Sequence, residues 1–108
     1  MIVVTTNELE RHSVKTYYGL VTGESISGVN LFRDFFASVR DIFGDRVRSY
    51  EKELLAAQET ALNEMVERAR NLGANAILGV NIDHEHIGGR QSMLLVSVYG
   101  TAAKIFSA

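Results

Sequence analysis

The sequence predicts an α+β fold with two layers, in which helices cover one face of a three-stranded sheet. Segments rich in β-branched residues lie on both sides of a long segment whose apolar residues recur every three or four positions. Two consecutive glycines join the last two β segments, which is typical of a hairpin. The 108 residues are enough for one domain, residues 1–108, in which two helices can cover only one face of a sheet.

The first quarter of the chain predicts two strands. Residues 2–6 indicate a short strand, and residues 14–27, which are rich in Val, Thr and Tyr, indicate a long one. Gly19 and Gly23 lie inside the second segment. We therefore expect the long strand to bend or to carry a β-bulge.

The middle of the chain predicts two helices. Asn30 is a suitable N-cap for a helix over residues 31–43, which Gly44 ends. A second helix is expected from Val47 or Tyr50 to Leu72, and Gly73 is its C-cap. At about 1.5 Å per residue this helix is about 39 Å long, so one small subunit can barely cover it. Its apolar stripe comprises Tyr50, Leu54, Ala57, Ala61, Met65, Ala69 and Leu72.

A strand is expected over residues 76–87, where apolar and polar residues alternate before the turn signal Gly88-Gly89. One side of this strand comprises Ala76, Leu78, Val80 and Ile82, and the other comprises Asn81, Asp83 and Glu85.

The last strand, over residues 92–106, is apolar on both faces, which indicates a central position in the sheet. Because the helices cover only one face, Met93, Leu95 and Tyr99 on the other face stay exposed unless a second subunit covers them. We infer a homo-oligomer.

Composition excludes several classes of protein. The chain has 11 Lys and Arg against 13 Asp and Glu, so no overall positive field favours nucleic acid or an anionic membrane as a partner. It has no cysteine, which excludes disulfides, thiolate metal sites and cysteine nucleophiles. The N-terminal residues lack the pattern of a secretory leader, and no apolar run is long enough to span a membrane. The expected location is the cytoplasm.

The segment Asp83-His84-Glu85-His86 is the candidate metal site. Residues two apart on a strand share a face, so His84 and His86 can present two imidazoles to one divalent ion, whereas Asp83 and Glu85 point the other way. Zinc takes three or four protein ligands, so His12, a carboxylate of another subunit or symmetry-related histidines must complete the site. Imidazole ligands favour zinc, nickel or copper(II). The alternative is a polar strand end without a ligand.

A second group of charged residues begins with Arg33-Asp34 and repeats seven residues later as Arg40-Asp41. These four residues have no opposite charges three or four positions apart among themselves, so their partners lie elsewhere. Candidate partners are Arg46, Tyr50 and Glu51 at the start of the second helix. Together the seven residues either bind a small anionic ligand through the arginines or form a structural network at the helix junction or subunit boundary.

Other motifs do not indicate an enzyme. The segment Gly23 to Gly28 has the glycine spacing of a phosphate loop, but Val29 and Asn30 replace the lysine and hydroxyl residue that such a loop needs. No serine or histidine stands in a context that activates a nucleophile.

Motifs through nearly the whole chain resemble those of the prokaryotic YbjQ-like family. They comprise Gly19 to Glu24, Gly28 to Asp34, Arg40 to Arg46, Tyr50 to Leu54, Leu72 to Ala76, Asp83, and Met93 to Ala102. Two positions differ from the family pattern: Asp45 replaces a second glycine, and His84 replaces an aromatic residue. The second difference affects the metal chemistry.

The resemblance implies a subunit similar to dodecin, with a strand, a long helical crossover and a two-stranded hairpin. The three-stranded antiparallel sheet then has the order 1-3-2, with the last strand central and a short N-terminal strand that serves assembly. It also implies a pentamer and heavy-metal binding. We therefore expect a non-enzymatic, cytoplasmic homo-oligomer that binds a metal ion or small ligand between subunits. The alternative is a structural ring that has no specific ligand.

Overall fold

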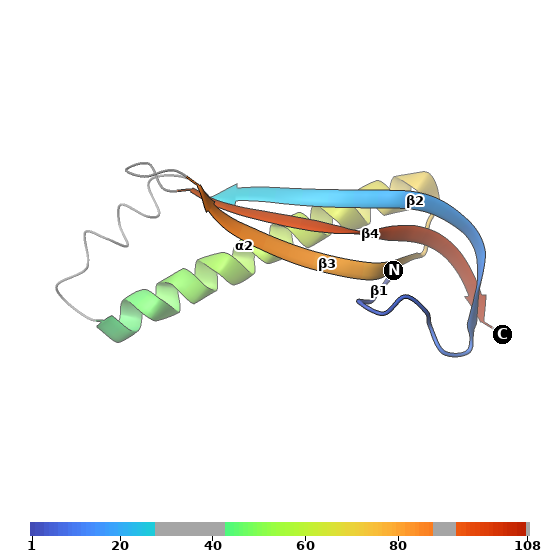
Figure 1. Cartoon of the computed structure of the whole chain (residues 1–108), viewed down its shortest axis with the longest axis horizontal. Coiled ribbons are helices and arrows are strands. Elements are labelled where there is room, and N and C mark those ends of the chain that lie inside the picture. Colours follow the sequence, from blue (N-terminus) through green and yellow to red (C-terminus); the bar gives the residue numbers. More distant parts are fainter. Residues whose placement is uncertain (28–42, 88–92, 108) are drawn as a thin grey trace.

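The computed structural model describes residues 1–27, 43–87 and 93–107. Its elements are, in chain order, β1 (Ile2–Val3), β2 (His12–Ser27), α2 (Phe43–Leu72), β3 (Ala76–Ile87) and β4 (Met93–Ser107) (Figure 1). The helix lies along one face of the sheet, which confirms the α+β class. The helix predicted over residues 31–43 falls almost wholly outside the described residues.

The sheet has four strands in the order β1-β3-β4-β2, so the prediction of a three-stranded sheet was wrong. The additional strand is β1, which pairs in parallel with Ala76 and Ile77 of β3 in its own chain. Strand β4 lies between β2 and β3 and is antiparallel to both, as its apolar residues on both faces predict. The central position of β4 is thus confirmed.

Strand β2 carries the predicted irregularity at Gly19, where the register with β4 shifts and φ is 102°. Gly23 has a different role, because a Cβ atom there would meet the backbone of Ala61 and Met65 in α2. A side chain at this position is excluded by the close approach of helix and strand. This contact places α2 over β2 and β4 rather than over β3.

The helix buries four small or flexible residues of the predicted stripe, namely Ala57, Ala61, Met65 and Ala69. Helix α2 begins at Phe43, so the predicted break at Gly44 and the start at Val47 or Tyr50 were wrong. Leu72 of the stripe is 48% exposed because the helix ends there. Ala74, just after the helix, belongs to the core beneath α2 instead. The predicted cap is confirmed: Gly73 has φ 95°, and Ala74 N donates to Ala69 O at 3.1 Å.

Strand β3 changes its buried face at Gly79. The register with β4 shifts between Leu78 and Asn81, and Gly79 has φ 60°. As a result Leu78 belongs to the core on the face away from the helix, whereas Val80 belongs to the core beneath the helix. The prediction that both residues share one side was wrong, because the bulge adds one residue to the alternation.

Among the residues that the structure describes, those that cover the face of the sheet away from α2 lie at one end of it. There Val4 and Leu9 of the N-terminal segment pack on a small core comprising Ala76, Leu78, Ala103 and Ile105. At the other end of this face, Ile26 is 64% exposed and Tyr99 is 37% exposed. We call this part, whose residues are exposed or half-buried, the open face of the sheet; it comprises Leu20, Thr22, Glu24, Ile26, Asn81, Asp83, Glu85, Met93, Leu95, Ser97 and Tyr99.

The molecule is elongated, with extents of 57 × 23 × 17 Å and a radius of gyration of 17.3 Å. A compact chain of this length has a radius of gyration of about 13 Å. No helix within the described ranges has the length and apolar character that crossing a membrane requires.

Candidate functional site

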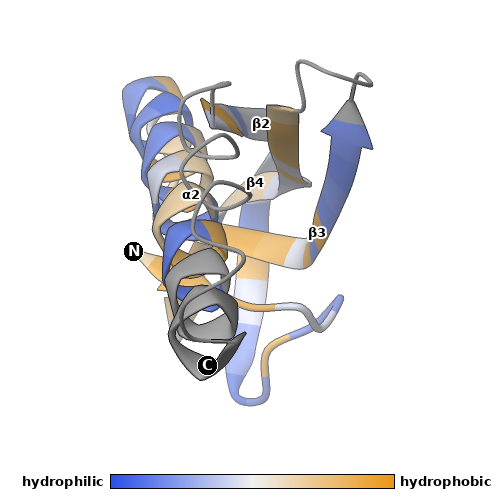
Figure 2. Cartoon of the chain, turned by 90° about the vertical axis from the view of Figure 1, so that its left-hand side faces the viewer, coloured by the Kyte–Doolittle hydropathy of each residue, from blue (hydrophilic) through white to orange (hydrophobic). Residues whose placement is uncertain are grey.

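The candidate metal residues lie at the end of β3 that follows the bulge. Figure 2 shows this strand changing from apolar to polar along its length. Residues 81–86 are all exposed, and we call them the exposed end of β3. Ile82, His84 and His86 are exposed on the helix side because α2 packs mainly on β2 and β4. Asn81, Asp83 and Glu85 lie on the face away from the helix.

The two histidines share one face of this strand. His84 pairs with Val96 and His86 pairs with Leu94 across the β3-β4 ladder. Leu94 and Val96 are fully buried in the core beneath α2, so both imidazoles lie on the helix side of the sheet. Both histidines are nevertheless exposed.

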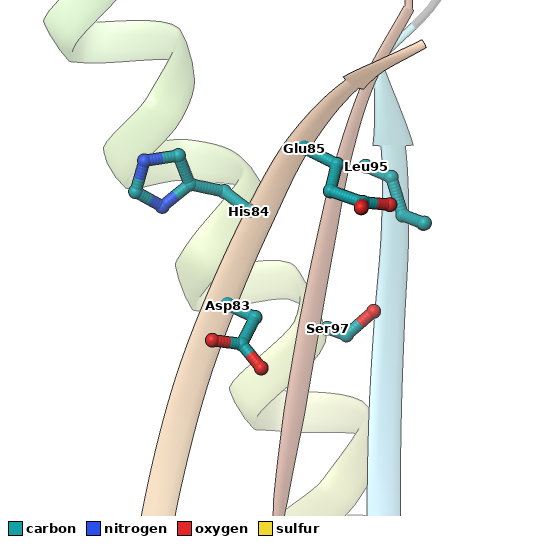
Figure 3. A pocket seen from close by; sticks show the side chains of 5 residues that line it. All are labelled: Asp83, His84, Glu85, Leu95 and Ser97. Carbon is teal, nitrogen blue, oxygen red and sulfur yellow. The ribbon is translucent and has the colours of Figure 1, made fainter.

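The two carboxylates lie on the opposite face. Asp83 pairs with Ser97 and Glu85 pairs with Leu95, both in the open face of the sheet. In Figure 3, His84 extends to one side of β3 toward the helix, whereas Glu85 and Ser97 extend to the other. The alternation predicted for Asp83 to His86 is therefore present.

An open hollow of about 400 Å³ lies at the edge of β3, lined by Asp83, His84, Glu85, Leu95 and Ser97. Two of its five lining residues, Asp83 and Glu85, carry carboxylates, which attract cations. Sequence reasoning missed Ser97 as a lining residue. The available signal was its polarity within the otherwise apolar run from Leu94 to Tyr99.

His12 does not belong to this site. It lies at the start of β2 opposite Ser107, and its Nδ1 atom is 2.8 Å from the carbonyl oxygen of Glu10. On β4, Ser107 lies eleven positions after Val96, the partner of His84. This separation is roughly 36 Å along the strand at about 3.3 Å per residue. His12 of the same chain therefore cannot complete a metal site with His84.

Within residues 1–27, 43–87 and 93–107, no three or more His, Asp or Glu side chains gather closely enough to hold a metal ion. Two imidazoles of one chain are fewer ligands than zinc normally takes. Any tight site at His84 and His86 must therefore draw its other ligands from outside the described part of this chain.

The second predicted group is only partly within the described residues. Arg33, Asp34, Arg40 and Asp41 fall outside them. Arg46 and Tyr50 lie in the first turns of α2, and Glu51 is exposed on the same helix. The anion site and the structural network both stay predictions.

Comparisons with known proteins agree with the fold and indicate no enzyme family. A solved structure from Pediococcus pentosaceus, of a protein with unknown function in the DUF74 family, matches with a TM-score of 0.62 over 98% of each chain. Its sequence is 17% identical, so the likeness shows a shared fold. The model of the YbjQ family, described as "Putative heavy-metal-binding", matches residues 1–106. Because this match spans nearly the whole chain, the protein belongs to the YbjQ family.

Proposed function

We propose that this chain is a non-enzymatic, cytoplasmic homo-oligomer that binds a divalent heavy-metal ion through His84 and His86 at a boundary between subunits. The observation that carries the proposal is the pair of imidazoles on one exposed face of β3. Residues two apart on a strand lie about 6.6 Å apart along the chain, which allows both rings to converge on one ion. The family description gives independent support, since it names heavy-metal binding.

The choice of metal follows from the ligand type. Imidazole nitrogen is a borderline ligand that suits zinc, nickel and copper(II), and the chain has no cysteine for softer ions. Asp83 and Glu85 add negative charge at the same end of β3, which raises the local concentration of cations.

The open face of the sheet supports assembly. Leu20 is 71% exposed and Ile26 is 64% exposed on this face, beside Tyr99. Apolar side chains gathered on one face are typical of a surface that another protein covers. A second copy of this chain is the partner we propose, with a pentamer as the assembly that the family resemblance implies.

Calorimetric titration with zinc, nickel and copper(II) tests the metal site. We expect saturable binding to the full chain and its loss in the double variant His84→Ala/His86→Ala. The variant His12→Ala is the matched control, because it removes one imidazole that lies eleven strand positions from the site and should keep full binding. Absence of saturable binding to the wild type, or equal binding by the double variant, contradicts the proposal.

A structural ring without a specific ligand is the second candidate function. The exposed apolar residues of the open face favour it, because they support assembly whether or not a metal is bound. If the assembly forms with and without added metal ions and the chain binds none of them, this second candidate is supported over the first.

A further inference from the structure

We propose that the metal ion joins two copies of this chain edge to edge through the exposed end of β3, with His84 and His86 of both copies as its ligands. This inference rests on the proposed function, because it uses the same pair of histidines. It adds the identity of the missing ligands and a metal-dependent step of assembly.

The first argument is the number of ligands. Tight zinc sites have three or four protein ligands, and one chain supplies two imidazoles on this face of β3. The described residues hold no larger group of ligands, and His12 lies at the far end of the sheet. A second copy placed by twofold symmetry doubles the set to four imidazoles, which is the number that a closed tetrahedral site requires.

The second argument is that this edge of the sheet is open. Strand β1 pairs only with Ala76 and Ile77, and the backbone of the N-terminal segment reaches β3 as far as Val80, whose N donates to Val4 O at 3.0 Å. From Asn81 onward, no strand in the described part of the chain lies along the outer side of β3. An exposed strand edge is a template for pairing with another strand.

The other edge of the sheet is occupied by a side chain. Arg68 of α2 donates to the carbonyl oxygen of Thr22 in β2 at 2.9 Å and to its hydroxyl oxygen at 3.2 Å. Glu64 holds the same guanidinium at 2.6 Å. An incoming strand would have to displace these bonds at the middle of β2. Of the two edges, the exposed end of β3 is therefore the better one for pairing.

The third argument is geometric. In an antiparallel pair, residues directly opposite each other lie on the same face, with Cβ atoms about 4.5–5.5 Å apart. A twofold axis that sets Glu85 opposite the partner subunit's Glu85 sets His84 opposite the partner subunit's His86. Four imidazoles then lie on the helix side of the joined sheet. Four imidazole rings on positions this close together can reach one zinc ion at zinc–nitrogen distances of about 2.0–2.1 Å.

The same register explains why the pairing should need metal. It sets Glu85 opposite its own copy on the other face, and like charges directly opposite each other destabilise a strand pair. Charged side chains on an edge strand prevent pairing with other chains. Without an ion, this repulsion keeps the two edges apart, and the four metal–nitrogen bonds overcome it.

Sedimentation velocity together with zinc titration tests the inference on the full chain. We expect zinc to double the mass of the metal-free particle, whatever its number of chains, with one ion bound per two chains. Addition of EDTA should reverse the doubling. The variant His84→Ala/His86→Ala should bind no zinc and keep the metal-free mass, while the control His12→Ala should behave like the wild type.

Each other outcome is decisive. One zinc ion per chain with unchanged mass overturns the joining of two copies but leaves the metal site intact. Doubling that persists in the double variant shows association through another surface and also overturns the inference. Absence of saturable zinc binding overturns the proposed function as well.

The variant Glu85→Gln tests the register independently of the ligands. It removes the repulsion between the two opposed carboxylates, so the zinc concentration for half-maximal doubling should fall severalfold. Asp83→Gln is the matched control, because it removes the same attraction for cations but Asp83 does not face its own copy in this register. An unchanged or higher zinc requirement for Glu85→Gln contradicts the proposed placement of the two strands.

Discussion

Gly23 of β2 lies directly beneath Ala61 of α2, with no room for a side chain between the two backbones. A Cβ atom at position 23 would meet the carbonyl oxygen of Ala61 and would lie 2.9 Å from the backbone nitrogen of Met65. These are backbone atoms of a helix, which cannot rotate away. The contact sets the position of α2 across the sheet, and thereby which strands it covers.

Replacement of Gly23 by alanine should therefore destabilise the fold. Overpacking of a core commonly costs about 1–3 kcal/mol, and we expect the upper part of this range because helix and strand must separate. Urea unfolding followed by circular dichroism measures the change. The control Glu24→Ala alters an exposed neighbour and should change the free energy of unfolding by less than about 0.5 kcal/mol. If Gly23→Ala lowers the free energy of unfolding no more than Glu24→Ala does, the close approach of β2 and α2 is contradicted.

Replacement of Asn75 by alanine should destabilise the junction between α2 and β3. The Asn75 side chain accepts a hydrogen bond from Ile105 N at 2.8 Å and donates one to Ile105 O at 2.9 Å, in a partly buried position. Loss of this paired contact leaves two backbone groups of β4 without these bonds, at an expected cost of about 1–3 kcal/mol.

Asn81→Ala provides the comparison for Asn75, since the exposed Asn81 side chain makes a single local bond to Gly79 O at 3.2 Å. The Asn81→Ala substitution should change the free energy of unfolding by less than about 1 kcal/mol. Thermal and urea unfolding of both variants give the two values. Equal losses would show that the paired bonds of Asn75 add no stability beyond a local contact.

Replacement of Ile26 by glutamate should weaken the proposed oligomer. Ile26 is 64% exposed on the open face of the sheet, where burial of a charge against a second copy is unfavourable. Light scattering after size-exclusion chromatography reports the mass of the particle, which we expect to fall. Leu55→Glu is a matched control on α2, because Leu55 is also 64% exposed. If only Leu55→Glu dissociates the particle, the assembly surface is the helix and not the open face.

Local patterns predict some elements of this fold well. The alternation and the flanking glycines predict a strand over residues 76–87, and β3 has these bounds. The spacing of Ala57, Ala61, Met65 and Ala69 predicts the buried stripe of α2, because helical periodicity depends only on neighbouring turns. The start of α2 is not predicted, since one glycine such as Gly44 costs a helix only about 1 kcal/mol relative to alanine.

The bulge in β3 depends on a contact that local patterns do not contain. Gly79 adopts a positive φ where β3 passes Gly100 of β4. A Cβ atom at position 100 would lie 2.7 Å from Ile77 Cγ2 and 3.1 Å from Val80 Cγ2. The pairing of the two strands therefore determines where the alternation of β3 reverses. A single strand read alone predicts Leu78 and Val80 on one side, although they pack in different cores.

The arrangement of the candidate site also depends partly on local alternation and partly on the tertiary structure. The sequence by itself determined that His84 and His86 share a face and that Asp83 and Glu85 share the other, because side chains alternate along any strand. Only the tertiary structure decided that the histidine face lies on the helix side and stays exposed. That outcome depends on where α2 crosses the sheet, and the crossing is set by Gly23 and Ala61, two residues far apart in the chain that meet only when it folds.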